Sequence, residues 1–187
     1  MILLDTERLR LRAFQLDDAE AMHRYAKNNR VGPMAGWAPH ESVDETRDVI
    51  RMFQQDQDVW AITLKATGEL IGSIGLHDRR PDPDIQHDNQ REIGYVLSPD
   101  HWGRGYVPEA VRELLRHGFV DLGLERIWCG YFDFNDRSRR VVEKCGFTYA
   151  FTTTQELTRL DGRTVRSLVY VITRDDYDNR SSLNGGI

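Results

Sequence analysis

The sequence predicts a single α/β domain whose core is a mixed, mostly antiparallel sheet with helices on both faces. Two periodicities support this class, because some segments alternate apolar and polar residues as strands do, whereas others place apolar residues at helical spacing. The predicted order is β, α, α, β, β, β, α, β, α, β, β, which fits neither a regular alternation of strands and helices nor an all-antiparallel meander. A chain of 187 residues, 40% of them hydrophobic, has the size and composition of one domain. We expect this domain to span residues 1–178 and a loose tail to occupy residues 179–187.

The chain is expected to begin with a strand at residues 8–14, where apolar residues alternate with arginines. A helix follows from Asp17 to about residue 28, because acidic residues are typical of a helix N-terminus and the apolar residues after them recur at helical spacing. Residues 31–40 are rich in Gly and Pro and are expected to form a loop.

A second helix is predicted up to about Gln55, since Ser42 or Asp44 can cap its N-terminus. The pattern then changes to two β-rich runs, at residues 59–65 and 70–78, joined by a short segment that contains glycine. This combination predicts an antiparallel hairpin.

The segment 79–90 combines two prolines with alternating charges, so we expect a solvated loop there. A fourth strand is predicted at residues 92–98, and the longest helix at residues 107–119. Pro108 in the first turn and Gly123 just beyond the end fit the boundaries of that helix.

The last third of the chain predicts a fifth strand at residues 126–132 and a short helix at 137–144, which Gly146 closes. Two long strands then flank an Asp-Gly turn at residues 161–162 and end at Thr173.

The charge balance limits the partners of the protein. Its 25 Lys and Arg against 30 Asp and Glu give a formal net charge of −5, which argues against a nucleic-acid binder and accommodates a cationic partner. Few apolar residues precede the charges near the N-terminus, so we expect no signal peptide, no membrane span and a cytoplasmic location.

The cysteines and histidines do not suggest a metal site. Cys129 and Cys145 lack the CxxC spacing and are expected to be reduced, buried residues rather than a disulfide or metal ligands. The six histidines are scattered, and the two closest in the middle of the chain, His77 and His87, have no metal-ligand spacing. No metal cofactor is therefore expected.

Two glycines stand directly before the longest helix. Gly103 and Gly105 flank Arg104 there, so several backbone N–H groups can point outward at a helix N-terminus, where the dipole favours a pyrophosphate. A tight strand-to-helix turn explains the same pattern. The motif is neither a Walker loop nor a dinucleotide fingerprint.

A second candidate motif lies at the start of the short helix. Asn135 precedes this helix and Ser138 lies on its first turn, so the plain interpretation is an N-cap followed by an ordinary helical residue. The arginines at positions 137, 139 and 140 are either solvated surface or groups that face the phosphates of a ligand.

Taken together, the motifs resemble one family. WGRGYVPEA at residues 102–110, N-x-x-S about thirty residues later and EKCGF at 143–147 are similar to the GCN5-related N-acetyltransferases. EIGYVL at 92–97 resembles the branch that modifies the N-termini of ribosomal proteins. The resemblance covers nearly the whole chain. It implies an N-acetyltransferase domain at 1–178, a sheet splayed between the fourth and fifth strands, and acetyl-CoA as co-substrate.

The resemblance also implies which residues bind acetyl-CoA. The family's phosphate-binding pattern falls on six consecutive residues: Trp102, Gly103, Arg104, Gly105, Tyr106 and Val107. Trp102 departs from the usual Gln or Arg and Val107 from a small residue, so this cradle must depend on backbone N–H groups. The pantetheine arm is implied to lie near Leu97, and Asn135 and Ser138 match positions that touch the cofactor.

Acetyl transfer to an amine requires a neutral amine, a polarised carbonyl and a stabilised thiolate. The resemblance implies that Glu92 acts as base, directly or through water, whereas the plain alternative is an exposed strand glutamate. Many members place a tyrosine where this chain has Val142, so we expect Ser138 to meet the thiolate. Trp37, in the Gly- and Pro-rich loop, either shapes the acceptor pocket or covers the core.

The implied reaction is transfer of an acetyl group from acetyl-CoA to a primary amine, either a protein N-terminus or a small amine. The competing hypothesis is a non-catalytic acetyl-CoA-binding sensor or docking module on the same fold. A purely structural protein is disfavoured by the glycines before the long helix. A homodimer is one possible state.

Overall fold

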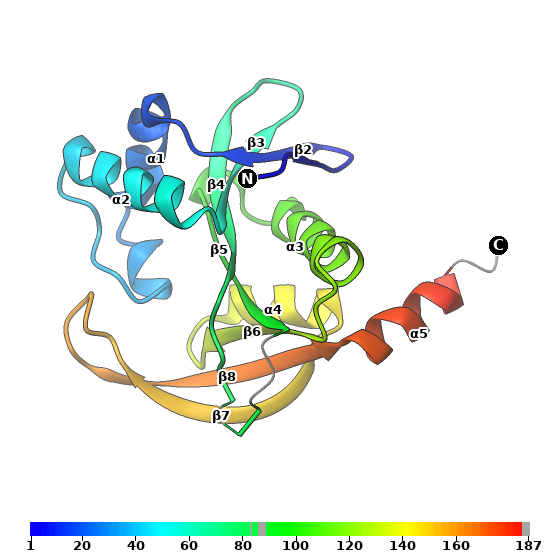
Figure 1. The fold of residues 1–187 in the computed structure, drawn as a ribbon. Coiled ribbons are helices and arrows are strands. Elements are labelled where there is room, and N and C mark those ends of the chain that lie inside the picture. The colour runs from blue at the N-terminus through cyan, green and yellow to red at the C-terminus, as the bar shows by residue number, and fades with distance from the viewer. Residues whose placement is uncertain (83, 86–88, 185–187) are drawn as a thin grey trace.

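The computed structural model describes residues 1–82, 84–85 and 89–184, and it contains a single twisted sheet flanked by helices (Figure 1). Over the described residues the sheet has eight strands in the order β1-β2-β3-β4-β5-β6-β8-β7. The strands are β1 (Leu4–Asp5), β2 (Leu9–Ala13), β3 (Val59–Leu64), β4 (Leu70–His77), β5 (Gln90–Leu97), β6 (Arg126–Phe132), β7 (Thr148–Glu156) and β8 (Thr164–Thr173). The α-helices are α1 (Ala19–Ala26), α2 (Val43–Asp56), α3 (Tyr106–Arg116), α4 (Asp136–Cys145) and α5 (Arg174–Asn184).

Only β5 and β6 pair in parallel in the described part of the sheet, and their ladder is short. It begins at Gln90 with Arg126 and ends at Ile93 with Cys129. On its other side, β5 stays paired with β4 as far as Leu97. The second half of β5 therefore has a strand neighbour on one edge only, at the place where the resemblance implies a splay.

Helices cover both faces of the sheet, as the sequence predicts. On one face, α3 packs over the sheet through residues such as Leu114, which is fully buried with Ile74 and Ile127. On the other face, α1 and α2 enclose a second cluster that includes Tyr25 and Ile50. The amphipathic spacing seen in the sequence is thus used to bury one stripe of each helix against the sheet.

The predicted order of elements is confirmed, with two additions and several shifted boundaries. The structure adds the two-residue strand β1, and β5 begins at Gln90 rather than at Glu92. The Gln90 side chain is buried, where it accepts a 2.7 Å hydrogen bond from the Trp128 indole. Within the expected loop at 79–90, residues 83 and 86–88 lie outside the described residues.

Helix α5 is the second addition, and it projects from the body of the protein (Figure 1). Residues 179–184 of the expected tail continue this helix, whereas 185–187 are not among the described residues. A reciprocal capping box explains its start. The Thr173 backbone N–H and hydroxyl donate to Asp176 Oδ2, and the Asp176 N–H donates to Thr173 Oγ1. This Thr-x-x-Asp pattern can begin a helix even where the residues that follow have no apolar stripe.

Both cysteines are free thiols. Cys129 is buried, as predicted, whereas Cys145 is only half-buried. Burial raises the pKa of the Cys145 thiol to about 11, so it stays protonated and unreactive at neutral pH. No helix in the described part of the chain is long and apolar enough to cross a membrane.

The capping box gives the first prediction. Asp176→Ala should destabilise α5 by about 1 kcal/mol, because the Thr173 groups lose their acceptor. Hydrogen bonds from Thr173 lower the pKa of the Asp176 carboxyl. Its stabilising effect should therefore be complete above the unfolded-state pKa and disappear as the pH falls through the lower folded-state pKa.

Amide exchange across α5, measured at pH 7 and at pH 3, checks this prediction. Asp175→Ala, at the neighbouring first-turn carboxylate, is the matched control. Equal protection of α5 in the wild type and Asp176→Ala at pH 7 would contradict the capping role.

Candidate active site

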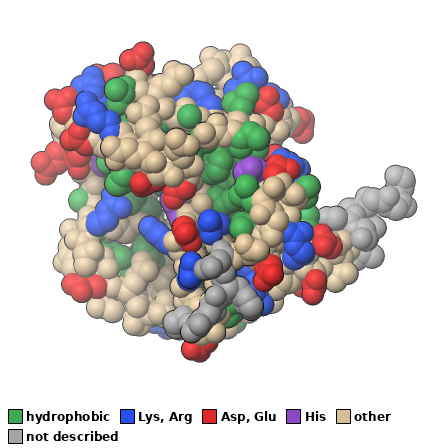
Figure 2. All heavy atoms as spheres, viewed as in Figure 1, with side chains coloured by type: hydrophobic (Ala, Val, Ile, Leu, Met, Phe, Trp, Pro, Cys, Tyr) green, Lys and Arg blue, Asp and Glu red, His purple; other side chains and the backbone are tan. Residues whose placement is uncertain are grey.

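A large cleft of about 1970 Å³ crosses the molecule beside β5. This volume is about twice the upper end of the range of roughly 300–1,000 Å³ that is typical for one small ligand. Figure 2 shows the face hollowed between its upper and lower halves, with hydrophobic, basic, acidic and histidine side chains gathered around the hollow. Residues from both faces of the sheet line the cleft, including Glu92 and His77 on one face and Tyr95 and Ser138 on the other. The cleft has room for two substrates at once.

The loop before α3 presents free backbone donors to this cleft. Gly103 and Gly105 have φ values of +77° and +80°, which glycine adopts without the penalty that a side chain imposes. No acceptor within the described residues takes a hydrogen bond from the backbone N–H groups of residues 103–107. Five consecutive donors at a helix N-terminus form a site suited to a phosphate or pyrophosphate.

Two residues that the sequence analysis did not single out hold this loop in place. The Glu109 carboxylate accepts hydrogen bonds from the Thr6 hydroxyl and from the Arg8 backbone and side chain. The Arg8 guanidinium also donates to the Arg104 carbonyl and lies 4.6 Å from the centre of the Tyr106 ring. The start of α3 is thus fixed by the turn between β1 and β2, about a hundred residues earlier in the chain.

The Trp102 side chain connects this loop to β5 and to α4. Its indole N–H donates to the Leu97 carbonyl at 2.9 Å. The guanidinium carbons of Arg137 and Arg30 lie 4.1 and 4.9 Å from the ring centre, as cation–π contacts. Of the three candidate arginines, Arg137 therefore lies beside the loop with the free donors. The Leu97 carbonyl already has one donor, so a sheet-like contact at this residue would use its N–H.

Unpaired backbone groups continue along β5. Ser98 donates to Ile71 at 2.8 Å, and because hydrogen bonds alternate along an antiparallel pair, the N–H groups of Tyr95 and Leu97 point away from β4. Pairing with β6 has ended before these residues. Their donors therefore face the opening between the two parallel strands.

Glu92 lies on the first half of β5, beside this opening. Its side chain is 21% exposed, and its Oε2 is 3.6 Å from the Arg79 Nη1. Burial raises the pKa of the Glu92 carboxyl above its ordinary value, although Arg79 and His77 oppose this effect. The alternative of an exposed strand glutamate is thus wrong, because the carboxylate is largely enclosed.

A row of glycines forms the floor beside Glu92. Gly75 on β4 is paired with Gly94 on β5, and Gly130 on β6 directly follows the last pair of the parallel ladder. A Cβ at Gly130 would lie 3.7 Å from Glu92 Oε1. Glycine inside a strand often marks a close approach of a ligand to the backbone. The strand glycines could therefore have indicated this part of the site from the sequence.

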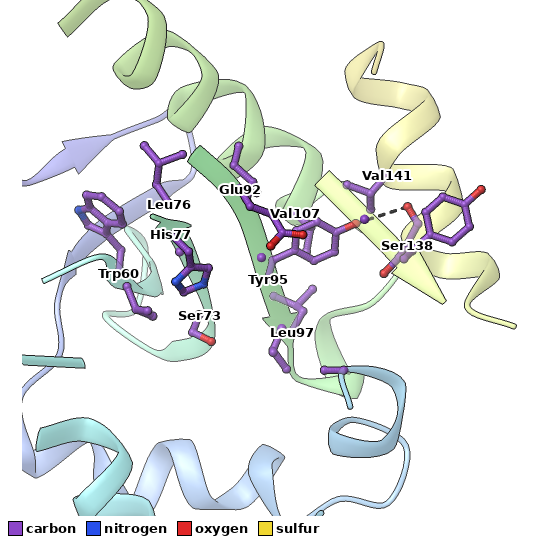
Figure 3. Close-up of a pocket in the computed structure, with 18 of the residues that line it drawn as sticks. Trp60, Ser73, Leu76, His77, Glu92, Tyr95, Leu97, Val107, Ser138 and Val141 are labelled. Carbon is purple, nitrogen blue, oxygen red and sulfur yellow. Dashed lines mark hydrogen bonds between the residues drawn. The ribbon is translucent and has the colours of Figure 1, made fainter. Parts of the chain in front are cut away.

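The start of α4 brings Asn135 and Ser138 to the cleft. The Asn135 amide caps the helix by accepting from the Ser138 N–H, and it also donates to the Met34 carbonyl at 3.0 Å. The capping interpretation is therefore correct, and the Asn135 side chain already has partners on both of its polar atoms. The Ser138 carbonyl accepts from the Tyr95 hydroxyl at 3.4 Å, and the Ser138 side chain interacts with the same hydroxyl (Figure 3).

Val142, at the position where many family members have tyrosine, is fully buried. The Tyr95 side chain extends from β5 to the first turn of α4, where its hydroxyl donates to the Ser138 carbonyl (Figure 3). Burial raises the pKa of this hydroxyl well above its ordinary value, so Tyr95 remains a neutral donor.

Trp37 lines the cleft from the loop between α1 and α2. The Trp37 backbone forms an isolated parallel β-bridge with that of Arg159. The backbone N–H of Ala38 donates to the Arg159 carbonyl at 2.8 Å. The loop is thus fixed to the β7–β8 connection. Trp37 also packs against the cluster under α1 and α2, so it both lines the cleft and covers the core.

Comparison with known proteins identifies the class. The acetyltransferase (GNAT) domain matches residues 8–148. An uncharacterised N-acetyltransferase of Bacillus subtilis (strain 168), YoaA, is 35% identical over 150 residues, which cover 78% of this chain and 82% of YoaA. The putative ribosomal N-acetyltransferase YdaF of the same organism is 29% identical over 148 residues, covering 75% and 78% of the two chains.

A crystal structure of a GNAT-family acetyltransferase from Bacillus anthracis has the same fold, with a TM-score of 0.82, 24% identity and coverage of 93% of this chain and 99% of that one. The family match spans most of the chain. The protein therefore belongs to the GCN5-related N-acetyltransferase family.

The free donors of residues 103–107 give the second prediction. Gly103 and Gly123 both have positive φ, and a Cβ at either would meet no atom within 4 Å. Alanine should therefore impose a similar strain of roughly 1–2 kcal/mol at both positions. Only Gly103→Ala should weaken acetyl-CoA binding, by about tenfold, because its methyl group lies where the anion approaches the backbone.

Calorimetric titration of both variants with acetyl-CoA, together with their melting temperatures, checks this prediction. Unchanged affinity in a folded Gly103→Ala variant would remove the loop from the binding site, as would an equal loss of affinity in Gly123→Ala.

Proposed function

We propose that the protein transfers an acetyl group from acetyl-CoA directly to a primary amine. The observation that carries this proposal is that five free backbone donors at the start of α3 and the enclosed Glu92 carboxylate line one cleft. An anion site and a base at opposite ends of one cleft fit a reaction between a phosphate-bearing thioester and an amine.

Acetyl-CoA is the co-substrate in this proposal, and no metal takes part. Its pyrophosphate binds the N–H groups of residues 103–107 beside Trp102, and its pantetheine arm bonds to the free N–H groups of Tyr95 and Leu97. One of these two N–H groups polarises the thioester carbonyl. Asn135 supports the site by capping α4 and fixing the loop at Met34.

Glu92 and Ser138 lie on opposite sides of the opening and take different catalytic roles in this proposal. Glu92, on the side of α1 and α2, removes a proton from the acceptor, directly or through one water molecule. Ser138, on the side of α4, donates a hydrogen bond from its hydroxyl to the departing thiolate. The glycine floor lets the acceptor nitrogen approach the backbone beside Glu92.

The acceptor is a protein N-terminus or a small amine, and the reaction takes place in the cytoplasm. The similarity to YdaF, a putative ribosomal N-acetyltransferase, supports the first acceptor class. The net charge of −5 suits cationic acceptors of either class. Trp37, at the outer wall of the cleft, contacts the acceptor in this proposal.

The alternative function is a non-catalytic module that only binds acetyl-CoA. The enclosed Glu92 argues against it, because burying a carboxylate costs free energy that a binding module has no reason to spend.

Measuring CoA release in the presence of amines distinguishes the two functions and is our third prediction. We expect the wild type to bind acetyl-CoA and to release CoA with at least one member of a panel of free-N-terminus peptides, diamines and polyamines. Binding without CoA release from any amine would favour the module, and release with hydroxyl or thiol acceptors alone would exclude an amine acceptor.

The fourth prediction concerns Glu92. Glu92→Gln should lower kcat by about a hundredfold near pH 7 and recover part of the rate as the pH rises, because hydroxide ion, which then becomes more abundant, can take the proton that Glu92 no longer accepts. Burial raises the pKa of this carboxyl, so folding favours its protonated form, and the wild type loses stability as the pH rises through that pKa. The neutral Gln avoids this loss and should be at least as stable as Glu at pH 7.

Rates from pH 6 to 9.5 and melting temperatures check these two effects. Ser138→Ala should lower kcat by about tenfold at every pH, because it removes a hydrogen bond rather than a base. A Glu92→Gln enzyme with the wild-type pH profile would exclude Glu92 from the mechanism.

A further inference from the structure

A histidine and an aspartate without an assigned role meet at the edge of the cleft. His77, at the end of β4, places Nδ1 2.6 Å from Oδ2 of Asp58, which precedes β3. A carboxylate only accepts hydrogen bonds, so Nδ1 is the donor to Asp58, and in the neutral imidazole Nε2 carries the lone pair. No described residue is hydrogen-bonded to Nε2. The pair thus presents a free imidazole base whose tautomer a carboxylate fixes.

Glycines make room for this imidazole. A Cβ at Gly75 would collide with the His77 ring, and one at Gly94 would lie 3.4 Å from Nε2. The ring therefore lies over the glycine floor of the cleft, which is the surface that the acceptor nitrogen approaches in the proposed function.

His77 also lies beside Glu92. The two residues are directly opposite each other in the β4–β5 ladder, and such partners project from the same face of a sheet (Figure 3). Charged groups near the ring include Asp58, Glu92 and the Arg79 guanidinium beside Glu92. Asp78, the next residue, pairs with Arg91 at 3.3 Å, and its side chain is 63% exposed.

We propose that His77 is a second proton acceptor of the active site and that Asp58 is the residue that positions it. This inference rests on the proposed acetyl transfer, and it supplies a step that Glu92 alone does not. An amine enters as an ammonium ion and leaves as an amide, so its nitrogen loses two protons in each turnover. Two adjacent bases can take one proton each.

The reaction proceeds through the following proton transfers and bond changes. His77 Nε2 takes one proton from the ammonium ion and leaves a neutral amine with a free electron pair. That pair forms the C–N bond at the thioester carbonyl carbon, the C–S bond breaks, and its electron pair leaves on the sulfur. Glu92 takes the second proton from nitrogen. One proton returns to the thiolate to give the CoA thiol, and the other passes to solvent.

The choice of His77 for the first proton follows from basicity. An imidazole is a stronger base than an ordinary carboxylate, so it accepts the proton of an ammonium ion at a smaller cost. Asp58 holds the ring through Nδ1, so Nε2 is the nitrogen left to accept a proton.

Replacement of His77 tests the proposal with an amine that the wild type acetylates. His77→Asn retains a donor for Asp58 but accepts no proton, so kcat should fall by about a hundredfold while the KM for acetyl-CoA changes less than twofold. His77→Ala should lose the same activity and regain part of it when imidazole is added. His117→Ala, which removes the histidine of another His–Asp pair, should show no such rescue.

Asp58→Asn tests the positioning role. The Asn amide can donate as well as accept, so it no longer selects the tautomer with Nε2 unprotonated, and kcat should fall by about tenfold while the KM for acetyl-CoA changes less than twofold. Asp78→Asn, at the adjacent exposed carboxylate, should leave kcat unchanged. A merely structural role of Asp58 would lower the melting temperature and raise the KM for acetyl-CoA along with the loss of kcat.

These variants test the role of His77 separately from the proposed function. A His77→Asn variant that is folded, as its melting temperature shows, and that keeps the wild-type kcat overturns the role of His77 and leaves the proposed function intact. A wild type that acetylates no amine overturns both. Loss of kcat with imidazole rescue, together with a lower kcat at an unchanged KM in Asp58→Asn, supports the pair as a proton acceptor.

Discussion

The end of the parallel ladder between β5 and β6 is the constraint on which the site depends. Backbone N–H groups inside a sheet normally have partners, yet β5 loses its neighbour on one edge after Ile93 while β4 holds the other edge to Leu97. The strand therefore cannot collapse onto β6 or detach from the sheet. Its free donors face an opening that is accessible from both faces, and the first turns of α3 and α4 lie beside it with Trp102 and Arg137 in contact.

Much of this arrangement could be predicted from local sequence patterns. Strand alternation and helix spacing gave the order of elements, and the glycines before α3 indicated the loop with free donors. Contacts between residues distant in sequence could not be predicted in this way. Arg8 meets Glu109 across 101 residues, and Asn135 meets Met34 across the same separation, because the sheet order brings β2 beside α3 and the loop after α1 beside α4.

Three features of the structure differ from what the local sequence patterns predict or add to it. The Thr-x-x-Asp pattern at the start of α5 is a capping box, but the absence of an apolar stripe favoured a loose tail. The glycines of β4, β5 and β6 appeared as separate residues in three strands, and only the register aligns Gly75 with Gly94 and brings Gly130 next to them. His77 was dismissed for lack of metal-ligand spacing, although its partner is a carboxylate nineteen residues away.

Polar groups without a hydrogen-bond partner among the described residues include the five N–H groups before α3 and the buried Tyr25 hydroxyl, and these groups border the opening. Gly103 and Arg104 are exposed, so water can solvate their N–H groups and the missing protein acceptors cost the fold little. An anion at this loop would exchange that water for direct hydrogen bonds at a helix N-terminus, where the dipole favours negative charge. The same loop can therefore stay folded without a ligand and still offer donors to one.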